Sequence, residues 1–140
     1  MINDRPTHLR VNLDAVLNNY RKLDKLNGLK TSLAVVKADS YGLGAKVIAD
    51  YLYKNGVRHF AVATLEEALE LKKYIKESLL LVLGVTNPKN VKYAVENNIS
   101  LTCPSKEWFE EALKELEKID GKLKLHIKLE TGMNRIGTSE

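Results

Sequence analysis

A lysine that directly follows a short apolar run is the first residue of this 140-residue chain whose type and position suit chemistry. Lys37 continues Ala34-Val35-Val36, so its amine would leave a buried strand at an apolar edge. Burial disfavours the ammonium form of such a lysine and leaves more free amine to form an imine with an aldehyde. The alternative is a lysine whose stem lies along a sheet and whose head reaches water. Position alone leaves both interpretations open.

The loop after this lysine could bind a phosphate group. Its sequence, Asp39-Ser40-Tyr41-Gly42-Leu43-Gly44, contains two glycines and runs into a predicted helix start. Such a loop offers backbone amides and a helix dipole to an anion. No complete dinucleotide-binding or P-loop pattern is present, so glycines that serve only a turn are the commoner explanation.

A second group of polar residues lies near the other end of the chain. Residues 123–129 alternate, which places the polar side chains on the face opposite the apolar ones; the polar set is Lys124, His126, Lys128 and Glu130. An edge strand with a solvated side and the polar interior of a barrel mouth both explain this pattern. His126 is interpreted as structural, because no second histidine or carboxylate lies at metal-ligand spacing.

The loop at residues 131–137 projects one arginine from the end of that run. The planar guanidinium of Arg135 could bind a phosphate, a carboxylate or a phenolate through paired hydrogen bonds. A surface arginine without a ligand is the commoner outcome.

Short apolar runs that alternate with amphipathic helical stretches must position these residues. This alternation predicts an α/β fold of parallel βα units, because runs without internal alternation fit strands that are covered on both faces. The predicted strands are residues 33–36, 60–63, 79–83, 99–102 and 123–129. Either an open doubly wound sheet or the first five strands of a (β/α)8 barrel fits them, although such a barrel typically needs about 250 residues. In both architectures the site lies at the carboxyl ends of the strands.

Capping residues predict where several helices begin. Thr64 and Glu67 form a capping-box pattern, Asn87 precedes Pro88, and Ser105 precedes a long helical stretch. Ahead of the first βα unit, residues 7–13 alternate as a half-buried strand would, and Asp14 is predicted to cap the helix that follows.

Composition limits the class of protein. The chain is 44% hydrophobic and 29% charged with a net charge of +4, which predicts one ordinary globular unit. The lysines are interspersed with acids, so a nucleic-acid face is disfavoured. The single cysteine, Cys103, excludes an internal disulfide and is expected at a buried strand end in a reducing compartment. With no signal pattern and no run long enough to span a bilayer, we expect a cytoplasmic protein without a membrane partner.

Two segments together resemble motifs of the alanine racemases, enzymes of fold type III that depend on pyridoxal phosphate (PLP). Residues 34–44, AVVKADSYGLG, closely resemble the family's cofactor-lysine motif, and residues 128–137, KLETGMNRIG, resemble its arginine loop. Arg5-Pro6-Thr7, followed by a strand and Asp14, is similar to the start of the family. The resemblance covers essentially the whole chain and favours an incomplete TIM-type barrel.

The resemblance implies a role for each of four residues. Lys37 would carry PLP as a Schiff base and act as the catalytic base on the D-alanine side, and Tyr41 would hydrogen-bond the cofactor phosphate. Arg135 would contact the phenolic oxygen of PLP and help to hold the substrate carboxylate. Lys128 matches a lysine that is often carbamylated and then orients the arginine. The implied function is interconversion of L-alanine and D-alanine for cell-wall peptidoglycan, by a cytoplasmic homodimer without a metal.

The chain departs from the family in three residues and in length. Ser40, Leu43 and Asn134 replace a common Ala, His and Gly, and the change at Leu43 puts a hydrogen bond near the cofactor in doubt. Residues 1–140 are expected to be the N-terminal portion of the barrel domain, with residues 1–13 forming a strand that would pair with a missing C-terminal β domain. The second catalytic base would then lie beyond Glu140, and the isolated chain is expected to be inactive.

Two alternatives remain at this stage. One is a related fold type III enzyme, either a broad-specificity racemase or an amino-acid decarboxylase. The other is an inactive cofactor-binding fragment, whose open five-stranded sheet would favour self-association through its apolar edges.

Overall fold

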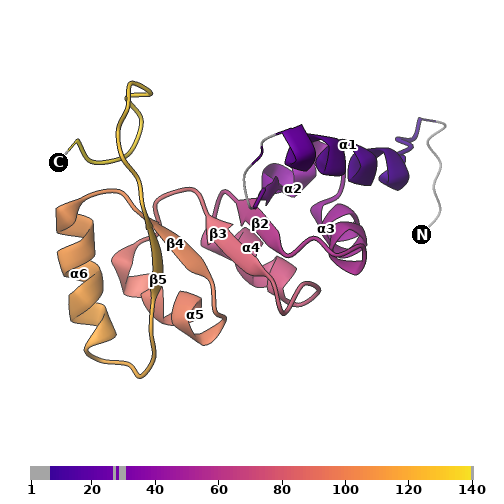
Figure 1. Cartoon of the computed structure of the whole chain (residues 1–140). Coiled ribbons are helices and arrows are strands. Elements are labelled where there is room, and N and C mark those ends of the chain that lie inside the picture. Colours follow the sequence, from indigo (N-terminus) through magenta and orange to yellow (C-terminus); the bar gives the residue numbers. More distant parts are fainter. Residues whose placement is uncertain (1–6, 27, 29–30, 140) are drawn as a thin grey trace.

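The computed structural model describes residues 7–26, 28 and 31–139, and these form one parallel sheet with flanking helices (Figure 1). The proposed match of Arg5 and Pro6 to the family start lies outside the described residues. The strands are β1 (Ala34–Val35), β2 (His59–Val62), β3 (Leu79–Val82), β4 (Ser100–Cys103) and β5 (Lys124–Ile127). The helices are α1 (Leu13–Leu26), α2 (Lys37–Gly42), α3 (Ala45–Lys54), α4 (Leu65–Lys72), η1 (Pro88–Asn90), α5 (Val91–Glu96) and α6 (Lys106–Leu116).

The order of the strands decides between the two predicted closures. All neighbouring strands are parallel, and the spatial order is β1-β2-β3-β4-β5 without a reversal. A doubly wound sheet reverses its direction of strand addition at a switch point, whereas a (β/α)8 barrel adds each strand to the same edge. The predicted fold class is confirmed: this is the first part of a barrel, and it is incomplete.

One hydrophobic core lies between the sheet and its helices. Val62, Val82 and Leu101 are neighbours on adjacent strands, and all three are fully buried. Phe60 and Leu80, which precede Val62 and Val82 by two residues, are also paired and fully buried. Helices α3, α4, α5 and α6 contribute the opposing side chains, which include Ile48, Leu52, Leu65, Ala68, Leu71, Val91, Ala94, Trp108 and Ala112. This packing fixes the directions of the strands and therefore the places where their carboxyl ends emerge.

The other face of the sheet carries apolar side chains on the first strands and polar ones on the last two. Across it, Ala61 is the neighbour of Leu81, Leu81 of Ser100, and Ser100 of Lys124. Leu125 of β5 points the other way and packs against the core. The polar side of residues 123–129 therefore belongs to the face that would become the interior of a closed barrel.

The predicted caps of three helices are confirmed. Thr64 and Glu67 form the reciprocal capping box at the start of α4. The side chain of Asn87 accepts a hydrogen bond from the amide of Lys89 before η1, and that of Ser105 accepts one from Trp108 at the start of α6. These caps satisfy amides that a helix leaves without partners.

The N-terminal segment differs from its prediction. Residues 7–12 form no strand, and α1 begins at Leu13. The cap of α1 is Asn12, whose Oδ1 accepts a hydrogen bond from the amide of Ala15 at 3.0 Å, whereas Asp14 accepts one from the hydroxyl of Tyr51. The predicted Asp14 cap is therefore wrong. Among the described residues no strand lies beside residues 7–12 to pair with them, and the prediction that residues 1–13 pair with a missing β domain stays a prediction.

Two smaller predictions have clear outcomes. Cys103 is free and buried at the end of β4, as expected. Within the described ranges, no helix is both long and apolar enough to cross a membrane.

Candidate active site

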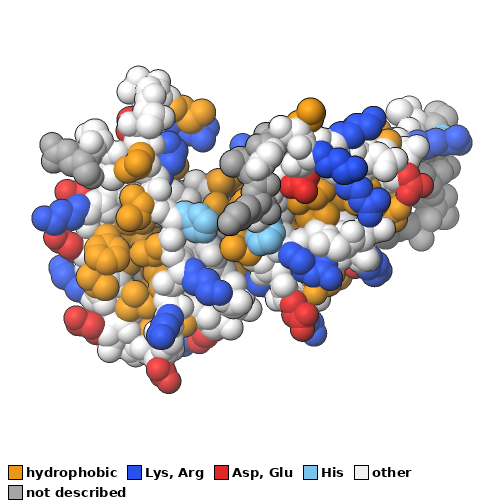
Figure 2. Space-filling view, in the orientation of Figure 1, with side chains coloured by type: hydrophobic (Ala, Val, Ile, Leu, Met, Phe, Trp, Pro, Cys, Tyr) orange, Lys and Arg blue, Asp and Glu red, His pale blue; other side chains and the backbone are white. Residues whose placement is uncertain are grey.

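A cleft at the carboxyl ends of the strands brings together one residue from each of the two sequence motifs. Its volume is about 320 Å³, within the usual range of small-ligand sites. Lys37 and Arg135 both line it, and the remaining wall comes from Ala63, Leu83, Gly84, Val85 and Ile136. Figures 1 and 2 show the loop after β5 projecting from the edge of the sheet, across a notch from the end that holds α1 and α2.

Lys37 emerges from the best-buried part of the first strand. Val36 is only 3% exposed, and its amide donates to the carbonyl of Ala61 at 2.9 Å, which extends the pairing of β1 with β2 by one residue. Lys37 itself is half-buried. Lys37 therefore follows directly on the pairing of β1 with β2 and lines the cleft.

The segment after Lys37 is a left-handed turn, which the sequence did not predict. Ala38, Asp39, Ser40 and Tyr41 all have φ between 50° and 57°, with ψ between 36° and 52°. Residues with a Cβ atom lose roughly 1–2 kcal/mol each in this conformation, and they keep it only where surrounding contacts determine the backbone. The amide of Ser40 donates to the carbonyl of Val36, and Ser40 is buried.

Tyr41 lies beside the lysine at the end of this turn. The Nζ atom of Lys37 is 6.0 Å from the centroid of the Tyr41 ring, which is at the outer limit of a cation–π contact. Tyr41 is 65% exposed, so its hydroxyl is accessible to a ligand. The structure thus places Tyr41 next to Lys37, although its predicted role at a phosphate stays a prediction.

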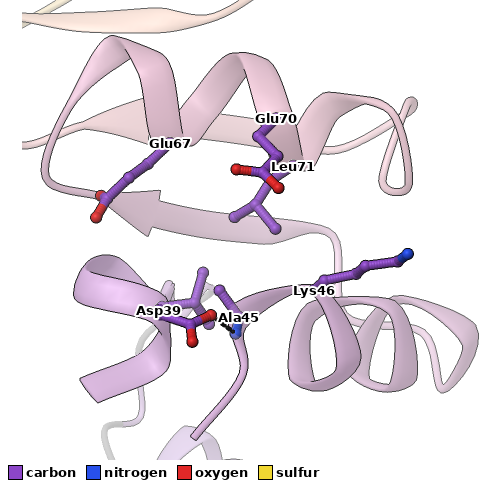
Figure 3. A pocket seen from close by; sticks show the side chains of 7 residues that line it. Asp39, Ala45, Lys46, Glu67, Glu70 and Leu71 are labelled. Atoms are coloured by element: carbon purple, nitrogen blue, oxygen red, sulfur yellow. Dashed lines mark hydrogen bonds between the residues drawn. The ribbon is translucent and has the colours of Figure 1, made fainter. Parts of the chain in front are cut away.

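The helix start that was considered for phosphate binding is already capped. The Oδ1 atom of Asp39 accepts a hydrogen bond from the amide of Ala45, the first residue of α3, at 2.7 Å (Figure 3). A carboxylate in this place satisfies the amide and complements the helix dipole. A phosphate at the start of α3 would have to displace Asp39, so this part of the loop prediction is not supported.

Arg135 is carried by a loop that closes on itself. The amide of Thr138 donates to the carbonyl of Lys128, and the amide of Glu130 donates to the carbonyl of Thr138, both at 2.9 Å. Gly137 makes this closure possible: its φ is +122°, and a Cβ atom there would lie 2.9 Å from the carbonyl oxygen of Lys128. The loop therefore presents Arg135, which is exposed, toward the cleft.

Glu130 holds the inside of the arginine loop, a role that the sequence analysis missed. Its Oε1 atom accepts a hydrogen bond from the amide of Gly132 at 2.5 Å. Hydrogen bonds from the backbone amides of Asn134 and Gly132 lower the pKa of this carboxyl group below its ordinary value of 4.5. No local signal in the sequence identified this contact, because the side chains that commonly accept from nearby turn amides are those of Ser, Thr, Asn and Asp.

Lys128 and His126 lie outside the lining of the cleft. The Nζ atom of Lys128 donates to the carbonyl of Leu129 at 2.6 Å, and its backbone amide donates to Cys103 at 3.0 Å. Carbamylation of Lys128 stays a prediction. His126 is exposed and opposite Thr102. The described part of the chain contains no group of three residues suited to hold a metal ion.

A second missed residue contacts the turn at residues 37–44, which we call the lysine turn. Glu67, expected only as a helix cap, lines a neighbouring pocket of about 410 Å³ together with Asp39, Lys46 and Glu70 (Figure 3). Its Oε1 atom accepts a hydrogen bond from the amide of Ala38 at 2.8 Å. The capping-box pattern identified the residue but not this contact, which joins segments far apart in the sequence.

Comparison with known proteins agrees with this geometry. Residues 11–140 match the model of the family described as alanine racemase, N-terminal domain. An alanine racemase of Staphylococcus carnosus is 46% identical over 134 residues, which are 95% of this chain and 35% of that protein. The chain thus spans about a third of the length of the curated relatives that it matches.

Two solved structures illustrate the likeness in three dimensions. Alanine racemase from Bartonella henselae with covalently bound pyridoxal phosphate has a TM-score of 0.82 and 33% identity, covering 91% of this chain and 37% of its own. A histidine racemase from Leuconostoc mesenteroides subsp. sake has a TM-score of 0.83 and 32% identity, covering 89% and 34%. With a family model that matches nearly its whole length, this chain belongs to the alanine racemase N-terminal domain family.

Proposed function

We propose that this chain forms the cofactor-lysine side of a racemase that interconverts L-alanine and D-alanine with PLP attached to Lys37. The observation that carries the proposal is the cleft itself, where Lys37 and Arg135 line one space at the carboxyl ends of the strands. Family membership and the Staphylococcus carnosus relative support alanine as the substrate.

The chemistry of the residues around the cleft fits PLP. An aldehyde needs a primary amine, and the half-buried Lys37 supplies one. A cofactor phosphate needs hydrogen-bond donors, which the accessible hydroxyl of Tyr41 offers beside that amine. Arg135 adds a charge-assisted donor pair for a phenolic oxygen or a carboxylate. The related Bartonella henselae enzyme contains PLP in covalent form.

The residues of this chain would divide the work in the following way. PLP supplies the electron sink that acidifies the α-proton of the amino acid. The amine of Lys37 takes up or returns that proton at the α-carbon on the D-alanine side, and Arg135 holds the substrate carboxylate. The apolar wall formed by Ala63, Leu83 and Ile136 limits access of water. A base from outside these residues must act on the opposite side of the α-carbon.

The wider assignments are part of the same proposal. D-alanine from this reaction would supply cell-wall peptidoglycan, and the whole protein would act as a cytoplasmic homodimer. Neither a nucleic acid nor a membrane is expected as a partner. Carbamylated Lys128 would orient Arg135. The two residues belong to the same loop, which is closed by the hydrogen bond from the amide of Thr138 to the carbonyl of Lys128.

Replacement of Lys37 tests the proposal. In the whole protein we expect Lys37→Ala to abolish both the visible absorbance of the lysine-bound cofactor and racemisation, because no other amine lines the described part of the cleft. Lys46→Ala is the matched control, since Lys46 lines the neighbouring pocket and its Nζ atom lies over the Tyr74 ring. Retention of both signals in Lys37→Ala would refute the assignment.

A racemase of broader specificity is the second candidate, and the likeness to a histidine racemase favours it. A panel of L-amino acids, analysed by chiral chromatography, separates the two candidates. We expect alanine to react fastest. Release of carbon dioxide instead of the D-isomer would indicate a decarboxylase.

A further inference from the structure

The carboxylate of Glu67 joins the ends of the first two strands. Its Oε1 atom accepts from the amide of Ala38 at 2.8 Å, and its Oε2 atom accepts from the amide of Ala63 at 2.8 Å. A longer contact of 3.4 Å from the amide of Thr64 completes the capping box. One side chain on α4 therefore contacts both the residue after Lys37 and a residue that lines the cleft with Lys37.

The contact with Ala38 takes the place of a backbone hydrogen bond. In the parallel pairing of β1 with β2, the amide of Val36 donates to the carbonyl of Ala61, and the next bond of that ladder would run from Ala38 to Ala63. The carbonyl of Ala63 instead accepts from the amide of Gly84 at 3.0 Å. Glu67 supplies the acceptor that the sheet no longer provides, at the point where the left-handed turn begins.

The charge of Glu67 is directed to the backbone. Among the described residues, the ion pairs of acidic side chains are formed by Asp50, Glu96, Glu110 and Glu115, and Glu67 has no cationic partner. Its donors are the backbone amides of Ala38, Ala63 and Thr64, and the carboxylate lies in the first turn of α4, where a helix dipole favours negative charge. Both oxygens are thus available to orient amides and are not drawn away by a mobile lysine.

We propose that Glu67 is a positioning residue of the active site. By holding the amide of Ala38, it determines the left-handed turn and hence the direction in which the amine of Lys37 meets an aldehyde. The inference rests on the proposed function for its catalytic consequence, while its structural part concerns this chain alone. Small misplacements of reacting groups lower rates by about 10- to 100-fold, which is the size of effect expected here.

Four variants of the whole protein separate positioning from capping. Glu67→Ala removes both contacts, and Glu67→Gln keeps one acceptor oxygen. Thr64→Ala removes the reciprocal cap, in which Thr64 accepts from the amide of Glu67, but leaves the contact with Ala38. Glu70→Ala is the matched control, because Glu70 lines the same pocket and, among the described residues, its carboxylate makes no hydrogen bond; its backbone carbonyl, which accepts from Lys73, is kept by the substitution (Figure 3).

The first measurement needs no cofactor. Amide hydrogen exchange of residues 37–44 in the apoprotein reports whether Glu67 holds the turn. We expect exchange to be at least about tenfold faster in Glu67→Ala, partly restored in Glu67→Gln, and within about twofold of the wild type in Thr64→Ala and Glu70→Ala. Equal exchange in Glu67→Ala and the wild type would overturn the inference.

The second measurement follows the rise of visible absorbance after PLP is added, together with racemisation. Glu67→Ala should slow attachment and lower kcat by about 10- to 100-fold, while KM for alanine changes less than about twofold. Equal losses in Thr64→Ala and Glu67→Ala would show that helix capping alone explains the effect. If the wild type attaches no cofactor, the proposed function fails, and hydrogen exchange alone still decides whether Glu67 orients the turn.

Discussion

Two loops supply the site, and they are held in different ways. The lysine turn, residues 37–44, is anchored by contacts from distant parts of the chain: Ala38 to Glu67 on α4, and Val36 to Ala61 on β2. The arginine loop, residues 128–138, is closed by hydrogen bonds among Lys128, Glu130 and Thr138. The first geometry therefore depends on the packed sheet, whereas the second depends mainly on local turn chemistry.

Their surroundings reinforce this contrast. The lysine turn begins next to Val36 and includes Ser40, which are 3% and 4% exposed. Both loops follow edge strands, but at the arginine loop Ile127, the last residue of β5, and Leu129 just after it are 71% and 58% exposed. Because buried neighbours restrict a backbone more than solvent does, we expect the lysine side to be preorganised in this chain and the arginine side to be the more mobile of the two.

Replacement of Arg135 should have the largest effect among the changes that compare the two loops. We expect Arg135→Ala to lower kcat/KM by about 10- to 150-fold, because a hydrogen bond to a charged group contributes about 1.5–3 kcal/mol. Attachment of PLP to Lys37 should remain, as should slow exchange in the lysine turn. Arg135→Lys keeps the charge without the planar fork and should recover only part of the rate. Loss of cofactor attachment in Arg135→Ala would show that the two loops are coupled.

Most of the architecture was accessible from the sequence because its signals are local. Apolar runs and the caps at Thr64, Asn87 and Ser105 each act within a few residues, so the strands could be predicted with ends off by one or two positions and the starts of three helices could be identified. The alternating residues 7–13 form no strand in this chain, since alternation shows that a strand is possible but does not supply the partner strand that was expected from a missing β domain. The pattern of apolar runs left the choice between an open sheet and a barrel undecided, and the family resemblance favoured the barrel; the strand order, which is a tertiary property, confirms it.

The candidate site could be predicted from the sequence only in part. Lys37 and Arg135 could be identified as candidates from their motifs, but their meeting in one cleft depends on how the parallel sheet places its strand ends. The left-handed turn could not be predicted from Ala38, Asp39 and Ser40, because such residues rarely have positive φ. It exists because Glu67, 29 residues away, accepts from Ala38.

A pair of glycine replacements tests the local closure of the arginine loop. In Gly137→Ala the new Cβ atom would meet the backbone of Lys128 and Glu130 at 2.9 and 3.0 Å, in addition to the unfavourable φ. We expect a local loss of about 1–3 kcal/mol, seen as faster amide exchange in residues 128–138 and a higher KM. Gly132→Ala has a similar φ but no atom within 4 Å, so its effect should be smaller. Equal effects would show that backbone strain, and not the close approach, controls the loop.

Acidification should produce the smallest change and should affect the arginine loop more than the lysine turn. Backbone amides lower the pKa of Glu130 in the folded protein, so the stabilisation is present above its unfolded value of 4.5 and is lost as the pH falls through the lower, folded pKa. We expect amide exchange in the arginine loop, corrected for its intrinsic pH dependence, to accelerate below about pH 4.5 while the lysine turn changes less. Glu130→Gln should abolish this pH dependence. A parallel response of both loops would contradict it.

The central claim is that Lys37 is the residue that carries the cofactor at the rim of this sheet. The most direct test is borohydride reduction of the whole protein with PLP, followed by intact mass and peptide mapping. The account predicts one pyridoxyl group per chain, located on the peptide that contains Lys37, and none in Lys37→Ala. Stable attachment to another lysine, or no attachment at all, would contradict it.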